Sequence, residues 1–152
     1  MAFNFGILDF IQHLRSPLGD LLMPFISMLG TGGILWIIIG LGLAIDPKHR
    51  KMAWVLFLAL GIEFLLCNVL LKNLFAMPRP CDLNPSVTLL IPKPQDYSFP
   101  SGHTASSFAA VTVLYLMGVK RWYWALVPAG LIAFSGMYLD VHFPIDILGG
   151  SL

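Results

Sequence analysis

Charged side chains are scarce in this sequence. Asp, Glu, Lys and Arg make up 11% of the 152 residues, whereas about a quarter of the residues in a soluble globular domain are charged. So few charges cannot cover a surface that faces water on every side. The formal net charge is +1, which gives no electrostatic basis for binding nucleic acid. These shortages exclude an ordinary soluble domain and argue against a nucleic-acid partner.

Cysteine is equally scarce, and the start of the chain lacks the features of a secretion signal. Cys67 lies in an apolar run and Cys81 in a polar segment, so no disulfide framework is expected. The first residues, Met-Ala-Phe-Asn-Phe-Gly, contain no basic region or small-residue cleavage site, so no removable signal peptide is expected. Hydrophobic residues, by contrast, make up 57% of the chain, and a lipid bilayer is the solvent that suits them.

Long apolar segments separated by polar turns predict membrane-spanning helices. A span needs about 20 residues, so 34–45 must either extend back through the glycines at 30–33 or form a broken span with 17–29. Residues 4–14 carry apolar side chains at spacings of three and four, which indicates an amphipathic helix at the membrane interface. The segments expected to span are 17–45, 52–76, 101–117, 122–139 and the short helix that begins at Pro144.

The predicted fold class is therefore all-α. We expect a polytopic membrane helical bundle of about five spans, with an N-terminal interfacial helix, forming a single domain over residues 1–152. The last span is incomplete, because the sequence ends at Leu152 soon after Pro144. A partial helix leaves backbone and apolar surface without partners. Either the chain is truncated or a neighbouring subunit fills the gap, so a homo-oligomer is one expected arrangement.

The placement of basic residues predicts the orientation of the bundle. The short turns 46–51 and 120–121 are basic and fall on the same side, which the positive-inside tendency makes cytoplasmic. Three polar segments, around residues 72–79, 100–103 and 142–146, then fall together on the opposite, extracytoplasmic side. Their convergence at one membrane face indicates a functional site.

The first polar segment contains two permanent cations, Lys72 and Arg79, at the end of an apolar run. Lys offers a flexible point charge, and Arg offers a planar fork that matches phosphate oxygens. The simpler interpretation is that both side chains extend to the interface and contact lipid head groups. Taken alone, this segment favours that non-catalytic role.

The second polar segment, Pro100-Ser101-Gly102-His103, opens a helix. Ser101 is a favourable N-cap, and Gly102 lets an anion approach the backbone. The free N–H groups and the positive end of the helix dipole attract anions, and His103 would lie beside a bound anion. An ordinary capped helix with an interfacial His is the simpler interpretation.

The third polar segment contains Asp140, His142 and Asp146. Since His142 and Asp146 are four residues apart, they can face each other across a helical turn. A carboxylate that accepts the Nδ1–H fixes the tautomer and leaves Nε2 free as a nucleophile or base. The same residues could instead form a structural His–Asp pair or a metal site that includes Asp140. Lys72 and Arg79 would repel a cation, so no metal is expected.

Together the three segments closely resemble the three motifs of the type-2 phosphatidic acid phosphatase superfamily, which also includes the vanadium haloperoxidases. Order and internal spacing both match over roughly residues 15–152. The matching residues are Lys72 with Arg79-Pro80 after six residues, then Pro100-Ser101-Gly102-His103, then Ser135 with His142 and, after three more residues, Asp146.

The resemblance implies a phosphohydrolase that needs no metal or other cofactor. His142 would attack phosphorus to form a phosphohistidine, and Asp146 would orient it. His103 would protonate the leaving oxygen and then help to activate water. Phosphoryl transfer depends mainly on positioning and on neutralising spreading negative charge, which suits these residues. By the same resemblance, the groups that hold the phosphoryl oxygens would be Lys72, Arg79, Ser101 and the amide of Gly102.

One position departs from the family pattern. The arginine of the third motif is Gly136 here. A hydrogen bond to a charged group contributes about 1.5–3 kcal/mol, so its loss alone slows the reaction about 10- to 200-fold. Lys93, in the loop, is a candidate to supply the missing charge. Glu63 is expected to lie away from the site, whereas Asn68, one turn below Lys72, is a candidate to support it.

The function expected from the resemblance is hydrolysis of a lipid phosphate or pyrophosphate at the extracytoplasmic face of a cell membrane. Candidate substrates are undecaprenyl pyrophosphate, phosphatidylglycerol phosphate and phosphatidic acid, and the short, loop-poor chain resembles bacterial members. Gly136 and the short C-terminus leave open a lipid-phosphate-binding pseudo-enzyme with weak or no turnover. An anion transporter could use the same cations, and a vanadate-dependent haloperoxidase is a more remote possibility.

Overall fold

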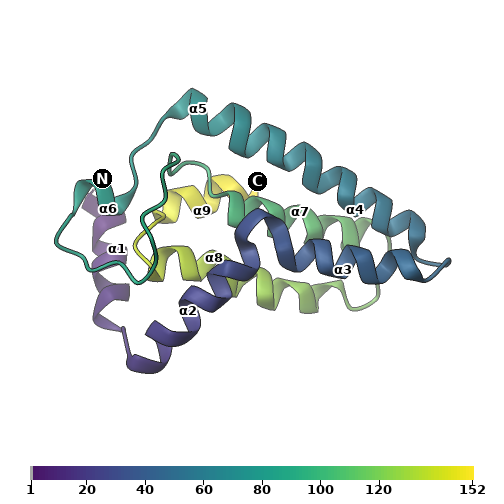
Figure 1. Ribbon diagram of the computed structural model, residues 1–152, viewed down its shortest axis with the longest axis horizontal. Helices are drawn as coiled ribbons and strands as arrows, with labels where there is room; N and C mark the ends of the chain where they lie inside the picture. Colours follow the sequence, from purple (N-terminus) through teal and green to yellow (C-terminus); the bar gives the residue numbers. More distant parts are fainter. Residues whose placement is uncertain (1) are drawn as a thin grey trace.

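The computed structural model describes residues 2–152, and these are helical or irregular, with no β-strand among them (Figure 1). The all-α prediction is confirmed for this part of the chain. The helical elements in chain order are α1 (Ala2–His13), α2 (Pro17–Gly30), η1 (Thr31–Gly33), α3 (Ile34–Ile45), α4 (Arg50–Glu63), η2 (Phe64–Leu71), α5 (Lys72–Phe75), α6 (Pro80–Leu83), α7 (Gly102–Leu116), η3 (Trp122–Ala125), α8 (Leu126–Tyr138) and α9 (Pro144–Ser151).

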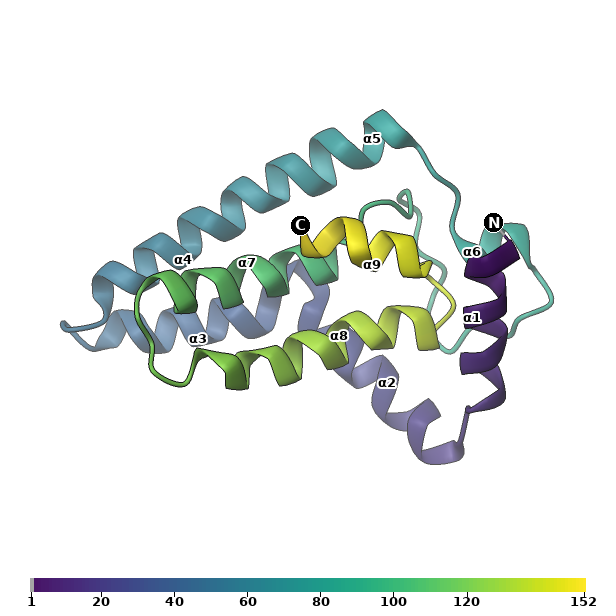
Figure 2. The same cartoon turned by 180° about the vertical axis from the view of Figure 1, so that it is seen from behind.

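Helix α1 lies across the end of the bundle, roughly perpendicular to the longer helices in both views (Figures 1 and 2). Its inner face buries Leu8 and Ile11, whereas Phe3 and Phe10 are exposed on the outer face. Such a two-faced helix suits a position along a membrane surface. The interfacial location remains a prediction.

Helices α2 and α3 form one apolar stretch that bends at η1. Ser16 caps α2 by accepting a hydrogen bond from the Gly19 N–H, and Pro17 occupies the first turn. The bend falls at Gly32 and Gly33, whose φ angles are 58° and 70°, a left-handed backbone that glycine adopts without a steric penalty. Of the two arrangements predicted for 34–45, the broken helix with 17–29 is the one found.

The next apolar stretch runs through α4, η2 and α5. Its middle part, η2, is a π-helix, which adds residues to each turn and often occurs near functional sites. Within residues 2–152, two helical stretches are long and apolar enough to cross a membrane, Pro17–Ile45 and Arg50–Leu83. The total of about five spans stays a prediction.

Helix α7 is the central element, because it contacts α4, α8 and α9. The core between these helices is apolar, with Leu56, Ala110 and Ala129 fully buried. Trp36 reaches into it from α3 and donates its indole N–H to Ser107 Oγ at 3.0 Å. Many large hydrophobic side chains remain exposed on the outside of the bundle, such as Leu58 at 64%, which is expected where lipid replaces water.

Candidate active site

A cavity of about 580 Å³ opens at one end of the bundle, a volume in the range of small-molecule sites. This is the end where α5, α6, the start of α7 and the turn between α8 and α9 meet, and the basic turn between α3 and α4 lies at the other end (Figure 1). All three polar motifs contribute to the lining. Its polar side chains include Lys72, Arg79, His103 and His142, together with Glu63, Asn68, Lys93 and Asp96.

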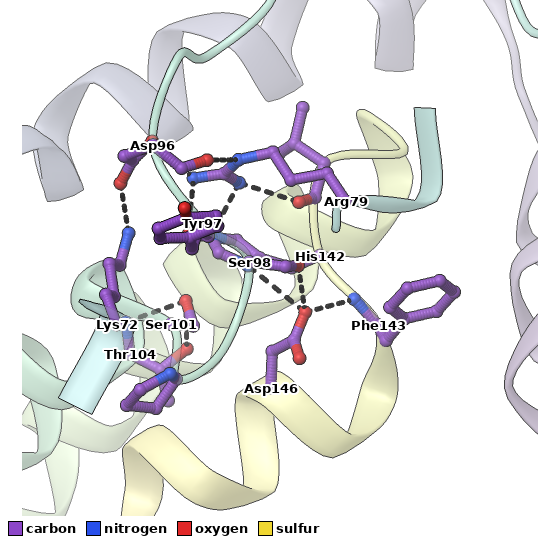
Figure 3. Close-up of polar contacts among 12 residues, drawn as sticks. Lys72, Arg79, Asp96, Tyr97, Ser98, Ser101, Thr104, His142, Phe143 and Asp146 are labelled. Atoms are coloured by element: carbon purple, nitrogen blue, oxygen red, sulfur yellow. Dashed lines mark hydrogen bonds and ion pairs between the residues drawn. The ribbon is translucent and has the colours of Figure 1, made fainter. Parts of the chain in front are cut away.

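His142 and Asp146 form a buried pair at the start of α9. The His142 Nδ1 and Asp146 Oδ2 atoms are 3.4 Å apart, and the two side chains are 3% and 0% exposed. Asp146 Oδ2 also accepts hydrogen bonds from the Phe143 N–H at 2.7 Å and from the Ser98 hydroxyl (Figure 3). These contacts fix the carboxylate, which in turn directs His142 Nε2 toward Arg79.

The surroundings of His142 favour its neutral form. Burial lowers the pKa of the imidazole, the hydrogen bond to Asp146 opposes this shift, and the positive charge of Arg79 adds to it. Arg79 Nη1 lies 3.4 Å from His142 Nε2. A neutral imidazole keeps a lone pair for nucleophilic attack.

His103 lies in the first turn of α7 and faces His142, with 6.4 Å between the two ring centroids. Its Nε2 is 3.4 Å from Thr31 Oγ1 in η1, so the bend at η1 places a hydroxyl beside the second imidazole. Two glycines give the rings room. A Cβ atom at Gly30 would lie 2.6 Å from His103 Cδ2, and one at Gly136 would lie 3.1 Å from His142 Cδ2.

Lys72 and Arg79 are buried cations, and both contact Asp96 in the loop before α7 (Figure 3). Lys72 Nζ binds Asp96 Oδ2, and Arg79 Nη2 lies 2.7 Å from Asp96 Oδ1. The Asp96 pKa falls to about 2, because these hydrogen bonds and charges outweigh the opposing effect of burial. Arg79 is further held by the Val141 carbonyl, 2.7 Å from Nη1.

Ser101 and Gly102 form the N-terminus of α7, but only Gly102 lines the cavity. The Ser101 side chain is fully buried and accepts hydrogen bonds from the N–H and hydroxyl of Thr104 at 3.4 and 3.2 Å. In this conformation its hydroxyl caps the helix. At Gly102 a Cβ atom would lie 2.5 Å from Asn68 Oδ1, so glycine allows α7 to pack against η2.

Gly136 stands where the family has arginine, and Lys93 is the candidate to replace its charge; both have defined contacts. The carbonyl of Gly136 accepts hydrogen bonds from the N–H groups of Val141 and His142, both at 3.1 Å. Lys93 lines the cavity, and its ammonium group pairs with Asp82 Oδ1 at 2.5 Å. Lys93 therefore brings a cation to the cavity, although Asp82 neutralises it in this conformation.

Sequence reasoning missed two cavity residues. Glu63 was expected to lie away from the site, yet it lines the same cavity as Lys72. Asp96 was not singled out at all. The only sequence signal for Asp96 is its place as one of two acids, with Asp82, in the segment 81–100 between the cation motif and the helix start.

The arrangement of the acids does not favour a metal. Within residues 2–152, no group of three or more His, Cys, Asp or Glu side chains is placed to hold a metal ion. The possible ligand set of Asp140, His142 and Asp146 is therefore not assembled there. Asp140 instead has a φ of 58° in the turn after α8, and burial, together with the charge of Asp9, raises its pKa to about 6.

The chain is similar to known phosphatases. A family model described as the PAP2 superfamily matches residues 52–152. An undecaprenyl-diphosphatase of Sulfolobus acidocaldarius is 33% identical over 153 residues, which cover 100% of this chain and 73% of that protein. The crystal structure of Aquifex aeolicus LpxE matches with a TM-score of 0.84 and 34% identity, over 99% of this chain and 89% of that one. A PAP2-type phosphatidylglycerolphosphate phosphatase from Bacillus subtilis matches with a TM-score of 0.80 and 28% identity, over 99% and 78%.

Proposed function

Because this chain belongs to the PAP2 superfamily and is a phosphatase, we propose that it hydrolyses a lipid phosphate or diphosphate through a phosphohistidine on His142. The observation that carries this proposal is the position of the His142 imidazole. It is buried, held at Nδ1 by Asp146 and directed at Nε2 toward a cavity that contains Lys72 and Arg79. A fixed nucleophile beside two cations is what phosphoryl transfer requires.

In the proposed first step, the terminal phosphoryl group binds with its oxygens on Lys72, Arg79 and the N–H of Gly102. The N-terminus of α7 adds the positive end of its dipole. His142 Nε2 attacks phosphorus and forms a P–N bond while the P–O bond to the leaving group breaks. His103, on the other side of the cavity, donates a proton to the leaving oxygen, so the lipid departs as a neutral hydroxyl or a phosphate monoester.

In the proposed second step, water hydrolyses the phosphohistidine. His103, now neutral, accepts a proton from water as the water oxygen attacks phosphorus. The P–N bond breaks, and its electron pair returns to His142 Nε2. Asp146 holds the same tautomer and ring position in both steps, so the second turnover begins from the same geometry as the first.

We propose a lipid diphosphate as the preferred substrate, with undecaprenyl diphosphate as the first choice. The relative from S. acidocaldarius bears the name undecaprenyl-diphosphatase, and it aligns along the whole of this chain. Lys93, at the cavity edge, offers a third cation to a substrate with two phosphates. Phosphatidylglycerol phosphate and phosphatidic acid are the next candidates.

We further propose that the bundle crosses the membrane several times with the cavity at the extracytoplasmic face. The basic turns 46–51 and 120–121 support this orientation, because short loops rich in Lys and Arg stay in the cytoplasm. A cavity near the head-group plane would admit a phosphate whose lipid tail remains in the bilayer.

Phosphate release tests the proposal. Purified wild-type protein in detergent is assayed against undecaprenyl diphosphate, phosphatidylglycerol phosphate and phosphatidic acid. We expect release from at least the diphosphate, no change on adding a metal chelator, and a loss of at least about 10³-fold in His142→Ala. His49→Ala is the matched control, because His49 is half-exposed and pairs with Asp46 at the other end of the bundle. Substrate binding without release by the wild type would favour the pseudo-enzyme instead.

A further inference from the structure

The two cations assigned to the substrate phosphate are already neutralised in part by a side chain of this protein. Asp96 bridges them with one carboxylate oxygen each, Oδ2 on Lys72 and Oδ1 on Arg79. Two oxygens of one phosphoryl group would bind the same pair in the same way. Asp96 and the substrate therefore compete for one position.

The burial of the three groups differs sharply. The side chains of Lys72 and Arg79 are 6% and 4% exposed, whereas that of Asp96 is 53% exposed. The carboxylate thus approaches the buried cations from the water side. It can rotate away into solvent without unpacking the core.

The loop itself is held by contacts that do not involve this carboxylate. Arg79 donates from Nε to the Asp96 carbonyl at 3.0 Å and from Nη2 to the Tyr97 carbonyl at 3.3 Å. The Ser98 N–H donates to the Met77 carbonyl at 2.9 Å. Because these backbone contacts remain when the side chain rotates, Asp96 can leave the cations while the loop stays in place.

We propose that Asp96 is a specificity-determining residue that excludes phosphodiester lipids from the phosphate site. This inference rests on the proposed function of Lys72 and Arg79. The two cations carry a charge of +2 and Asp96 a charge of −1. A phosphodiester head group also carries −1, so exchanging it for Asp96 gains no charge neutralisation and loses a partner that is tethered to the site. A terminal phosphomonoester carries about −1.5 to −2 at pH 7, and it alone completes the neutralisation.

The need for such a residue follows from where the site would lie. In a membrane, phosphodiester lipids surround the cavity at far higher concentration than any lipid phosphate. Lys72 and Arg79 without Asp96 would bind these head groups, and the substrate would meet an occupied site. Asp96 therefore weakens binding of the substrate slightly and binding of the surrounding lipids more.

The test measures inhibition by phosphatidylglycerol, a phosphodiester with a net charge of −1. Wild type, Asp96→Asn, Asp96→Glu and Asp46→Asn are assayed with undecaprenyl diphosphate in micelles of a non-ionic detergent. Phosphatidylglycerol is added in steps, and the same mole fractions of diacylglycerol correct for surface dilution. Asp46→Asn is the matched control, because the Asp46 side chain is about as exposed as that of Asp96 and pairs with His49 at the other end of the bundle, away from Lys72 and Arg79.

Asp96→Asn is expected to have a KM about three- to tenfold lower than the wild type without phosphatidylglycerol, at an unchanged kcat, because the competing carboxylate is absent. With phosphatidylglycerol its KM should rise at least about fivefold, whereas the wild type, Asp96→Glu and Asp46→Asn should follow the diacylglycerol curve. An active Asp96→Asn that also follows the diacylglycerol curve, or an Asp96→Glu as sensitive as Asp96→Asn, overturns the inference. A wild type that releases no phosphate would instead overturn the proposed function.

Discussion

Each imidazole of the site lies against a glycine, and in both cases the space is tight. At Gly136 an added Cβ would lie 3.1 Å from His142 Cδ2, tighter than most contacts that a Cβ atom makes. The position that departs from the family's arginine is therefore also the surface on which the proposed nucleophile lies. Gly136 therefore has two effects on the site: it removes the family's positive charge, and it leaves room for the His142 ring.

Gly136→Ala tests this role. The new methyl group should displace the His142 ring by a few tenths of an ångström and lower kcat by about three- to thirtyfold, since small misplacements of reacting groups slow catalysis strongly. Gly130→Ala, in the same helix, has no atom within 4 Å of its added Cβ and should retain wild-type activity. Equal activity of the two variants, measured as phosphate release, would contradict this role.

The environment of His142 determines how kcat/KM should depend on pH. Burial lowers the pKa of His142 below its ordinary value, so the neutral nucleophile persists to lower pH. The acid limb of kcat/KM should then have its midpoint below about 6.5. The groups that face this ring are Asp146, which raises the pKa, and Arg79, Lys72 and His103. Asp96 stays ionised throughout, because its pKa is about 2.

Asp146→Asn removes the contact that raises the pKa of His142, so the acid limb should move to still lower pH. The rate should also fall about 10²- to 10⁴-fold, because the tautomer is no longer fixed. A pH–rate profile of kcat/KM for both proteins provides the measurement. A midpoint that moves upward in the variant would show that Asp146 does not hold His142 in this way.

At the residue scale, the sequence identified the groups whose chemistry is distinctive. Lys72, Arg79, His103 and His142 line one cavity, and the family resemblance drawn from their motifs is confirmed. Asp96 was missed because an acid in an irregular loop has no periodicity or spacing to mark it. Its role depends on a fold of the loop that sequence patterns do not describe.

At the scale of helices, starts and ends follow local chemistry. Ser16 before Pro17, Ser101 and Pro144 each begin a helix where the sequence predicted one. The π-helix η2 and the short helix α6 were not predicted. Residues 64–71 continue the apolar run of α4 without a Gly or Pro, so nothing in the sequence marks the wider turn.

The hydroxyl of Tyr138 joins the start of α2 to the site end of α8. Tyr138 donates its hydroxyl to Asp20 Oδ1 at 2.8 Å and accepts the Ser16 N–H at 3.2 Å. Tyr138→Phe leaves both partners without this group and should lower the free energy of unfolding by about 1–2 kcal/mol. The melting temperature in detergent should fall while kcat stays near the wild-type value. Tyr115→Phe, at a position 57% exposed, serves as the control, and equal melting temperatures for the two variants would argue against the anchor.

At the scale of the whole molecule, the sequence predicted an all-helical chain and the meeting of distant motifs at one end. Alternation of apolar runs and polar turns was sufficient for this, since antiparallel helices return the chain to the same end after every second crossing. The crosswise direction of α1 (Figures 1 and 2) is the one expected of the interfacial helix that its spacing predicts. The angle at η1 depends on contacts between helices, which the sequence pattern does not describe.

The proposed orientation predicts which cysteines a membrane-impermeant maleimide labels in intact cells. Lys93→Cys lies at the cavity edge and should be labelled from outside, whereas Lys120→Cys lies in the turn at the opposite end and should react only after the cells are opened. The native Cys67 and Cys81 are buried and provide the background. Labelling of Lys120→Cys in intact cells would contradict the proposed orientation.

The most direct measurement traps the covalent intermediate. The wild type is mixed with substrate labelled in its terminal phosphate, and the reaction is quenched rapidly in alkali, in which phosphohistidine is stable. Digestion at alkaline pH and mass spectrometry should locate the phosphate on His142, with no labelled peptide in His142→Ala. Phosphate found on His103 or another residue, or equal labelling in His142→Ala, would contradict the assignment of His142 as the nucleophile.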